Sequence, residues 1–274
     1  MKKAILLTGI IAWSLLGLIV LGVLIAAMSG SNAPAWVQKL PGYGWTGNDV
    51  ILFGGNTALV LEESFPTEGL GEFNVYAAHQ RISVTVNNGE ELIVRQYGHD
   101  NAVPFTSDMG IGSLTVRTNS KFTINVMSIG ISSLEISVPR SYAGAVSLNT
   151  NSGSIRIEEG VTWGDTNIQT SSGSVRLNAP ASFDNLQIKT ASGSIRSGDI
   201  NGGDITVESS SGSQTLGTLN ADGSVNLTSS SGSVKADAVR STQHKIRTSS
   251  GSIRIGELTG DGDVRSSSGS VKTG

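Results

Sequence analysis

The stretch TSSGSVRL, residues 170–177, recurs with small changes along the second half of the chain. Close copies are TASGSIRS (190–197), TSSGSIRI (248–255) and SSSGSVKT (266–273). The central glycine of the Ser-Gly-Ser triplet returns every 18–20 residues, at Gly153, Gly173, Gly193, Gly212, Gly232, Gly251 and Gly269. A unit this short cannot bury a core by itself, so neighbouring units must stack on one another.

Apolar residues occupy fixed positions relative to each glycine. The position five residues before it holds Leu148, Ile168, Ile188, Val207, Leu227, Ile246 and Val264. The positions two and four residues after it are also mostly apolar, and a third inward position is expected at Val161, Phe183, Ile200, Leu219, Val239 and Leu258. Two alternating strands and a further inward corner per unit are typical of a parallel β-solenoid with rungs of about 20 residues.

Two weaker copies precede the triplets, GIGSLTV (110–116) and GISSLEI (130–136), and they put Gly112 and Ser132 in the glycine position. Nine rungs at about 4.8 Å would form a rod of roughly 40 Å. A right-handed coil is the default expectation, although the sequence does not choose between the two hands. We therefore predict an all-β fold with a solenoid over residues 111–274.

The inward positions change parity at the glycine. Side chains of a straight strand alternate with period two, so the chain must turn a corner or form a bulge there. We interpret the triplet glycines as structural turn residues, because glycine reaches positive φ at no steric cost. The two flanking serines are expected to form hydroxyl ladders from rung to rung. Parity also turns Thr150, Thr170, Thr190 and Thr248 inward or into the corner, which disfavours an outward ice-binding face.

A basic residue follows each glycine by three positions, between two inward positions, and therefore faces outward. This column is Arg156, Arg176, Arg196, Lys235, Arg254 and Lys272, with Thr215 in the remaining slot. Like charges at a spacing of about 4.8 Å repel one another. Two interpretations stay open: a solvated face of mixed charge that keeps the rod soluble, or a column that binds an anionic envelope polymer or phosphate headgroups.

Composition excludes several other functions. The net charge of −3 gives no overall attraction to nucleic acid, and the absence of cysteine excludes disulfides and thiolate chemistry. Serine catalysis needs a nearby base, and the only histidines, His79, His99 and His244, do not recur with the repeat. Clustered carboxylates of a polysaccharide-cleaving enzyme are missing, and Asp-Gly-Asp at 261–263 is a weak calcium motif. We predict a non-enzymatic protein without cofactor or metal.

The N-terminus predicts a membrane anchor. After Lys2 and Lys3, residues 4–28 are uncharged and long enough as a helix to cross the roughly 30 Å hydrocarbon core. The two lysines place residues 1–3 in the cytoplasm and the rest outside. A cleaved signal peptide is the alternative, because small residues lie near position 28. Residues 29–50, rich in glycine and proline, are expected to be a juxtamembrane linker.

Residues 51–110 predict an antiparallel or mixed β cap before the repeats. Alternating segments at 59–64, 72–77, 81–86 and 91–98 are the best strands. Asn87-Asn88-Gly89 predicts a hairpin turn between the last two of them. Larger aromatic side chains collect in this region, as a capping segment requires.

The arrangement resembles the bacterial "putative adhesin" family of β-strand-repeat proteins. The resemblance covers about residues 58–274 and rests on FNVYAAHQRISVTVNNGEELIVRQYG and on the SGS(I/V)(R/K) units. It implies a parallel β-solenoid, an extracytoplasmic location and, in the membrane-anchored members, a link to cell-envelope stress responses. It transfers no catalytic residues.

From these features we expect a membrane-anchored, extracytoplasmic adhesin or envelope-interaction module. Its partners would be the membrane, an anionic cell-wall polymer or another surface protein, with end-to-end self-association of rods as a further possibility. Two alternatives remain: an accessory regulator of an envelope-stress sensing system, and a polysaccharide-active β-helix enzyme.

Overall fold

The computed structural model describes residues 44–46, 49–51, 58–98, 102–118, 132–158 and 160–274. The chain forms two units, Met1–Asn56 with Thr123–Gly130, and Thr57–Phe122 with Ile131–Gly274. In the first unit, β1 (Gly44–Thr46) pairs antiparallel with β2 (Asp49–Ile51), so the segment expected to be an irregular linker contains a short strand pair. The expected anchor at residues 4–28 lies outside the described residues. Among the residues that are described, no helix is long and apolar enough to cross a membrane.

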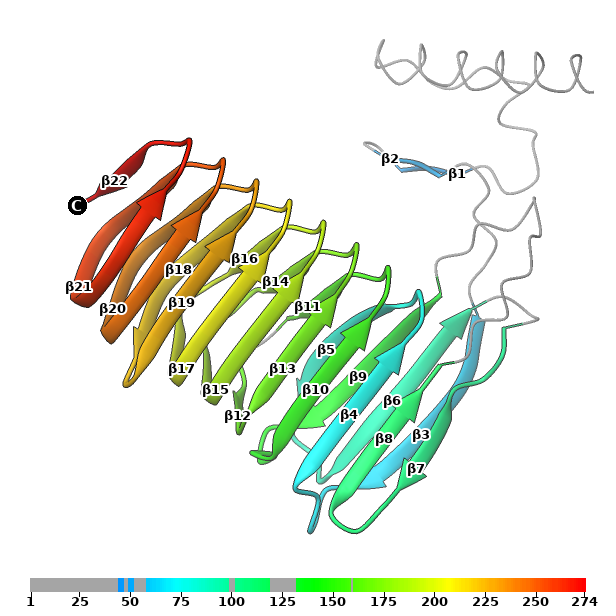
Figure 1. The fold of residues 1–274 in the computed structure, drawn as a ribbon. Coiled ribbons are helices and arrows are strands. Elements are labelled where there is room, and N and C mark those ends of the chain that lie inside the picture. Colours follow the sequence, from blue (N-terminus) through cyan, green and yellow to red (C-terminus); the bar gives the residue numbers. More distant parts are fainter. Residues whose placement is uncertain (1–43, 47–48, 52–57, 99–101, 119–131, 159) are drawn as a thin grey trace, which may run out of the picture. The chain divides into compact units, whose positions relative to one another are not determined.

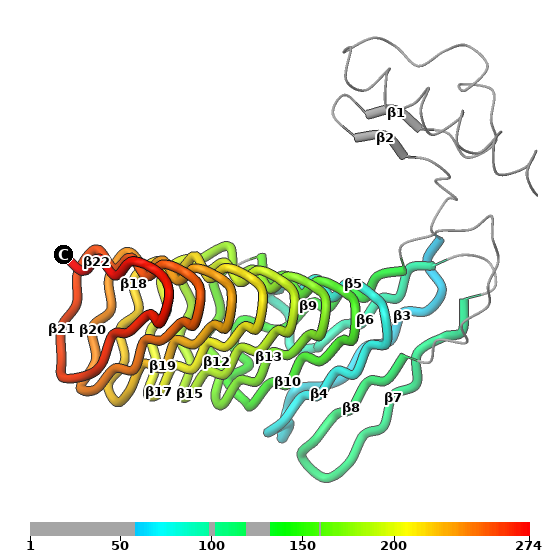
Figure 2. Tube along the Cα trace, turned by 45° about the horizontal axis from the view of Figure 1, so that its top comes forward, coloured from blue at the N-terminus to red at the C-terminus, as the bar shows by residue number. Residues whose placement is uncertain are grey.

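The second unit is a parallel β-solenoid, as predicted, and its turns follow one another along the rod in Figure 1 and Figure 2. Three faces carry strands. The first face holds β8 (Ser113–Arg117), β4 (Glu72–Ala77), β10 (Ala145–Thr150), β13 (Thr166–Thr170), β19 (Ser224–Ser229) and the later parts of β15 (Ala181–Thr190), β17 (Ile200–Ser209), β20 (Val234–Thr248) and β21 (Ile253–Ser266).

The second face holds β9 (Ser133–Pro139), β5 (Arg81–Asn87), β11 (Ile155–Ile157), β14 (Val175–Leu177), β16 (Ile195–Ser197), the start of β18 (Gln214–Ala221), the starts of β20 and β21, and β22 (Val271–Thr273). The narrow third face begins at β12 (Thr162–Trp163) and continues through the middle or ends of the longer strands. The complete rungs from β10 onward therefore pass the three faces in turn.

The predicted inward rows form the core. Leu148, Ile168 and Ile188 lie in register on the first face and are fully buried, and Ile155 and Val175 do the same on the second. On the third face, Ile200 pairs with Leu219, which pairs with Val239, as expected. Phe183 is buried, as expected, but it is not in the row of Ile200, because Ala181 is the residue that pairs with Ile200. The Phe183 ring packs edge-on against Trp163, with ring centroids 6.3 Å apart.

The order of rungs along the rod does not follow the sequence. Strand β4 lies between β8 and β10, and β5 lies between β9 and β11, all in parallel register. The sequence assigns residues 72–87 to the cap. In the structure they form a rung of the solenoid, which lies between the strands of residues 113–139 and the rung that begins at Ala145. Pairing across the three rungs puts Leu134 beside Ile82 and Ile82 beside Ile155.

The strand register shows whether the two weak repeat copies place Ser132 and Gly112 in the glycine position. Ser132 precedes β9 as Gly153 precedes β11, so Ser132 does occupy the glycine position. Gly112 does not, because it leads into β8, a first-face strand in which Leu114 pairs with Phe73. Gly112 was assigned wrongly because the sequence pattern of a glycine followed by an alternating strand is the same for strands of the first and the second face.

The predicted hairpin between 81–86 and 91–98 is also wrong. Strands β3 (Ala58–Pro66) and β6 (Glu91–Gly98) pair antiparallel, β7 (Thr106–Met109) pairs antiparallel with β8, and β9 lies between β5 and β6. The turn residue Asn87 accepts a hydrogen bond from the Gly89 N–H (2.8 Å) and donates one to the Ser137 carbonyl of β9 (3.1 Å). The turn is therefore local, and the long-range partner of both strands is β9.

The triplet glycines stack directly on one another at one corner of the rod. Their φ angles are not the reason for glycine: among the described glycines φ is positive only at Gly69, Gly112 and Gly260. The prediction of a positive-φ turn was therefore wrong. A Cβ atom on Gly173 would instead lie closer than 3.0 Å to the Gly153 carbonyl, and each later glycine meets its predecessor in the same way. Glycine is required because backbone packs against backbone from rung to rung.

The hydroxyl three residues before each glycine completes this corner. Thr170 Oγ1 accepts a hydrogen bond from the Gly173 N–H (3.0 Å) and donates one to the Gly153 carbonyl of the preceding rung (3.0 Å). Thr190 and Thr248 repeat both bonds, and Ser266 makes them with a serine hydroxyl. These threonines are buried, as parity predicted.

The serines that flank the glycine do not form the expected ladders. Both rows are exposed throughout the described part of the solenoid. Among the described residues, the side-chain bonds between triplet serines are one between the Ser270 and Ser252 hydroxyls (3.2 Å) and one from the Ser252 N–H to the Ser233 hydroxyl (3.3 Å). The corner is satisfied by the inward threonine column, which leaves the serine hydroxyls to solvent or to a ligand.

Candidate binding surfaces

The cationic column is the row Arg156, Arg176, Arg196, Lys235, Arg254 and Lys272 on the second face. Strand register places these residues side by side, Arg156 beside Arg176 and Arg176 beside Arg196, with Thr215 in the gap before Lys235. Their side chains alternate with buried neighbours and point outward, as predicted. The column therefore continues over the second face to the last described rung.

One of the six cations in the column has an acidic partner. Arg156 Nη1 lies 3.4 Å from Glu158 Oε1, and the same carboxylate accepts a bond from Asn178. For the other five, the described residues provide no carboxylate within 4.0 Å. The position two residues beyond the column is small or neutral in most rungs, with Gly198 after Arg196 and Gly256 after Arg254, and it is acidic at Glu158 and Asp237.

Several cations elsewhere on the rod are paired, although Lys245 and Arg81 have no carboxylate within 4.0 Å among the described residues. Lys189 lies 3.2 Å from Glu208, Arg240 makes a bidentate contact with Glu257 (3.0 and 2.8 Å), and Asp263 binds both Arg247 and Arg265 (2.7 and 2.5 Å). The Arg240 guanidinium lowers the pKa of Glu257 through these bonds. Asp263 of the Asp-Gly-Asp motif is thus held by two arginines, which opposes a role as calcium ligand.

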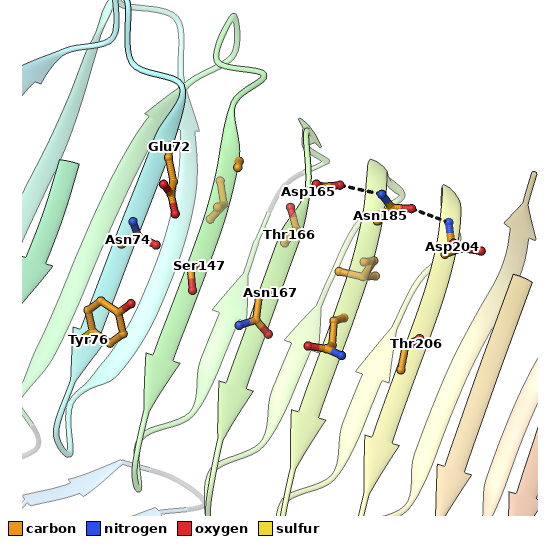
Figure 3. A pocket seen from close by; sticks show the side chains of 14 residues that line it. Glu72, Asn74, Tyr76, Ser147, Asp165, Thr166, Asn167, Asn185, Asp204 and Thr206 are labelled. Carbon is orange, nitrogen blue, oxygen red and sulfur yellow. Dashed lines mark hydrogen bonds between the residues drawn. The ribbon is translucent and has the colours of Figure 1, made fainter. Parts of the chain in front are cut away.

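Sequence reasoning missed a polar groove on the first face. It has a volume of about 680 Å³ and crosses β4, β10, β13, β15 and β17. Figure 3 shows its side chains rising from successive strands, with Asp165, Asn185 and Asp204 linked along one rim. Bonds from the Ser224 hydroxyl and N–H lower the pKa of Asp204. The signal in the sequence was the enrichment of Asn, Gln and Asp at two outward positions, six and eight residues before the glycine.

The histidines and carboxylates do not assemble a catalytic site in the described part of the chain. His79 Nδ1 lies 3.3 Å from Ser152 Oγ, but no carboxylate is bonded to this imidazole. His244 is buried in a first-face inward position between Val225 and Gly262. A glycosidase acid needs a raised pKa, whereas the pKa of groove residue Asp204 is lowered. No group of three or more potential metal ligands occurs among the described residues.

A comparison with known protein families finds one whose profile matches the solenoid. The Toastrack DUF4097 family profile matches residues 74–221 and 184–273, which is most of the stretch that carries the resemblance seen in the sequence. Among curated proteins, none matches the chain.

Two crystal structures are similar to the chain. One is a putative adhesin from Bacteroides fragilis NCTC 9343, with 15% identity over 78% of this chain and 96% of the other, at a TM-score of 0.40. The other is a putative cell adhesion protein from Clostridium sporogenes ATCC 15579, with 10% identity over 80% of this chain and 100% of the other, also at a TM-score of 0.40. The profile match covers well over half of the residues, and this chain belongs to the Toastrack DUF4097 family.

Proposed function

We propose that this protein is a non-enzymatic, membrane-anchored adhesin-type module whose solenoid lies outside the cytoplasmic membrane. Its cationic column binds a polyanionic polymer of the cell envelope. The anchor would be residues 4–28, with the linker 29–50 between it and the rod.

The observation that carries this proposal is the unpaired state of the column. Five cations lie in one row without a carboxylate within 4.0 Å. On the other faces Lys189, Arg240, Arg247 and Arg265 each have one, whereas Lys245 has none among the described residues. Adjacent unit charges at about 4.8 Å repel by roughly 1 kcal/mol in water. A bound polyanion with charges along its length would remove that repulsion.

The surface beside the column supports an anionic ligand. The exposed serine that follows each triplet glycine precedes the basic residue by two positions, so a rung offers Ser174 next to Arg176 and Ser194 next to Arg196. Hydroxyl and guanidinium donors together suit phosphate or carboxylate oxygens. From Arg156 to Lys272 there are six strand steps, or roughly 29 Å, which favours a chain over a single small anion.

Replacing Arg156, Arg176, Arg196 and Arg254 together by glutamine should abolish binding to a poly(glycerol phosphate) polymer on beads. Each cation near an anionic surface contributes about 1 kcal/mol, so four replacements should weaken binding at least ~100-fold at low salt. Retention of the full chain on the beads, measured by pull-down, checks this result. Wild-type binding should also weaken steeply as salt is added.

A matched control separates the column from overall charge. The variant with Lys189, Arg240, Arg247 and Arg265 replaced by glutamine loses the same four charges, from exposed ion pairs that contribute little to stability. It should bind nearly as well as the wild type. Equal loss in both variants would reduce the effect to net charge, and equal retention in both would overturn the proposed function. Vesicles of phosphatidylglycerol and phosphatidylcholine form the second arm, and a preference for them over the polymer would contradict the polymer assignment.

The anchor has its own test. The full chain should stay in the membrane fraction after alkaline or high-salt washing, and removal of residues 4–28 should release it. Protease added outside intact cells should degrade the solenoid. A full chain that washes off the membrane, or a solenoid protected in intact cells, would contradict this part of the proposal.

A further inference from the structure

We propose that the groove on the first face binds an uncharged oligosaccharide lying across strands β4, β10, β13, β15 and β17. This site is separate from the cationic column on the second face and does not depend on the proposed function. The argument rests on the groove's shape, on its hydrogen-bonding groups, on Tyr76 and on its charge.

The groove is long and continues into a second one. Its lining runs from Asn74 on β4 to Thr206 on β17, four strand steps or roughly 19 Å. A neighbouring groove of about 360 Å³ holds Asn149, Asn151 and Gln169, and Tyr76 lines both. An extended chain of several sugar rings fits this shape better than one compact ligand does.

The lining offers groups that both donate and accept hydrogen bonds. Six amide side chains surround the two grooves besides Asn185 of the rim: Asn74, Asn149, Asn151, Asn167, Gln169 and Gln187. Within the described part of the chain, no side-chain hydrogen bond engages Asn74 or Gln187, and Asn167 Oδ1 has no partner. A sugar hydroxyl is itself both donor and acceptor, and an amide matches it with two donors and an acceptor.

Tyr76 provides an aromatic surface among these amides. It is 40% exposed although it lies on a central strand of the face, and Figure 3 shows it at the end of the groove on the same strand as Asn74 and Glu72. The Arg117 guanidinium lies 4.5 Å from the ring centroid and holds the ring in place. The apolar C–H face of a sugar can pack on such a ring while its hydroxyls reach the amides.

The charge of the groove excludes the ligand proposed for the column. Glu72, Asp165 and Asp204 line it, and neither lysine nor arginine does. Bonds from Ser224 lower the pKa of Asp204, which favours its charged form further. Polyanions are repelled here, whereas an uncharged glycan can use the carboxylates as acceptors. On the last two described rungs of this face, by contrast, Asp263 is held in ion pairs with Arg247 and Arg265.

The test measures binding of neutral hexasaccharides, cellohexaose and chitohexaose, to the purified full chain by calorimetry. The detergent must carry no sugar headgroup, since such a detergent would compete for the groove. We expect saturable binding of at least one probe. Tyr76→Ala should weaken it about tenfold, and the pair Asn74→Ala with Gln187→Ala by a similar factor.

Two control variants show whether the binding depends on the Tyr76 ring and on the groove alone. Tyr76→Phe keeps the ring and should bind nearly as the wild type does, which separates stacking from loss of fold. The four-glutamine column variant should bind the neutral probes normally. Failure of both probes to bind, or binding that Tyr76→Ala leaves unchanged, would overturn the proposal. So would neutral-sugar binding that disappears in the column variant, because the two surfaces would then be one site.

Discussion

Gly193→Ala should destabilise the solenoid by about 3 kcal/mol or more, a large effect for the addition of one methyl group. The new Cβ would lie closer than 3.0 Å to the Gly173 carbonyl, which is backbone and cannot rotate away. Relief requires the two rungs to separate, and separation breaks strand pairs such as Ile195 with Val175 on the adjoining face. The measurement is the free energy of unfolding by denaturant, followed by circular dichroism.

Gly198→Ala is the matched control, five residues later in the same rung. There the Cβ would lie 3.4 Å from the nearest atom, the Ala179 carbonyl carbon, which is an ordinary contact distance. Its φ is not in the left-handed region, so this variant should unfold within about 1 kcal/mol of the wild type. If the two variants were equally stable, backbone stacking would not be what selects glycine at Gly193.

The sequence predicted the solenoid because one signal was repeated seven times. The spacing of the triplets set the rung length, and the apolar rows at Leu148, Ile155 and Ile200 identified inward positions that are now buried. A parity change at the glycine required a corner, and the corner is there. Each inference came from a local pattern that recurs, and the averaging over copies removed most of the ambiguity.

Features set by long-range pairing could not be predicted in the same way. The rung formed by residues 72–87 lacks a Ser-Gly-Ser triplet and has Gln80 where the rungs from Gly153 onward have glycine, so its place between β9 and β11 left no periodic signal. The hairpin expected around Asn88 failed for the same reason: β9, almost fifty residues away in sequence, is the partner of both strands. The residues of a turn predict the local bend of the chain, but they do not predict which strand will pair with the strands on either side of it.

Of the two candidate binding surfaces, the sequence predicted the cationic column but not the groove. The cationic column was predictable because its residue type is nearly constant from rung to rung, but whether Arg176 or Arg196 had a carboxylate partner depended on contacts between rungs. The groove was missed because its residues share hydrogen-bonding capacity and not identity: Asn74, Ser147, Asn167 and Gln187 occupy one outward row. A search by chemical type, in place of residue name, would have found that row.

Thr170→Val should cost about 2–4 kcal/mol in the free energy of unfolding. Valine keeps the shape of threonine but cannot bond, so it strands the Gly173 N–H and the Gly153 carbonyl, which the hydroxyl now holds at 3.0 Å each. Both groups lie in the buried corner, and an unsatisfied buried polar group costs about 1–3 kcal/mol. Hydrogen exchange of the Gly173 amide should accelerate in the variant even under conditions in which the fold persists.

Thr170→Ser separates the hydroxyl from the methyl group. Serine already occupies this position as Ser209, Ser229 and Ser266. Ser229 and Ser266 accept the bond from the glycine N–H at 2.9 and 2.8 Å, whereas the Ser209 hydroxyl donates to the Gly212 carbonyl (2.6 Å). We therefore expect Thr170→Ser to lose no more than about 1 kcal/mol, from the buried methyl alone. If valine were tolerated better than serine, the inward column would act through packing, and the glycine corner would have to be stabilised by strand pairing alone. The expected order, threonine above serine above valine, would instead make this hydroxyl the group that allows bare backbone to stack on bare backbone without loss of hydrogen bonds.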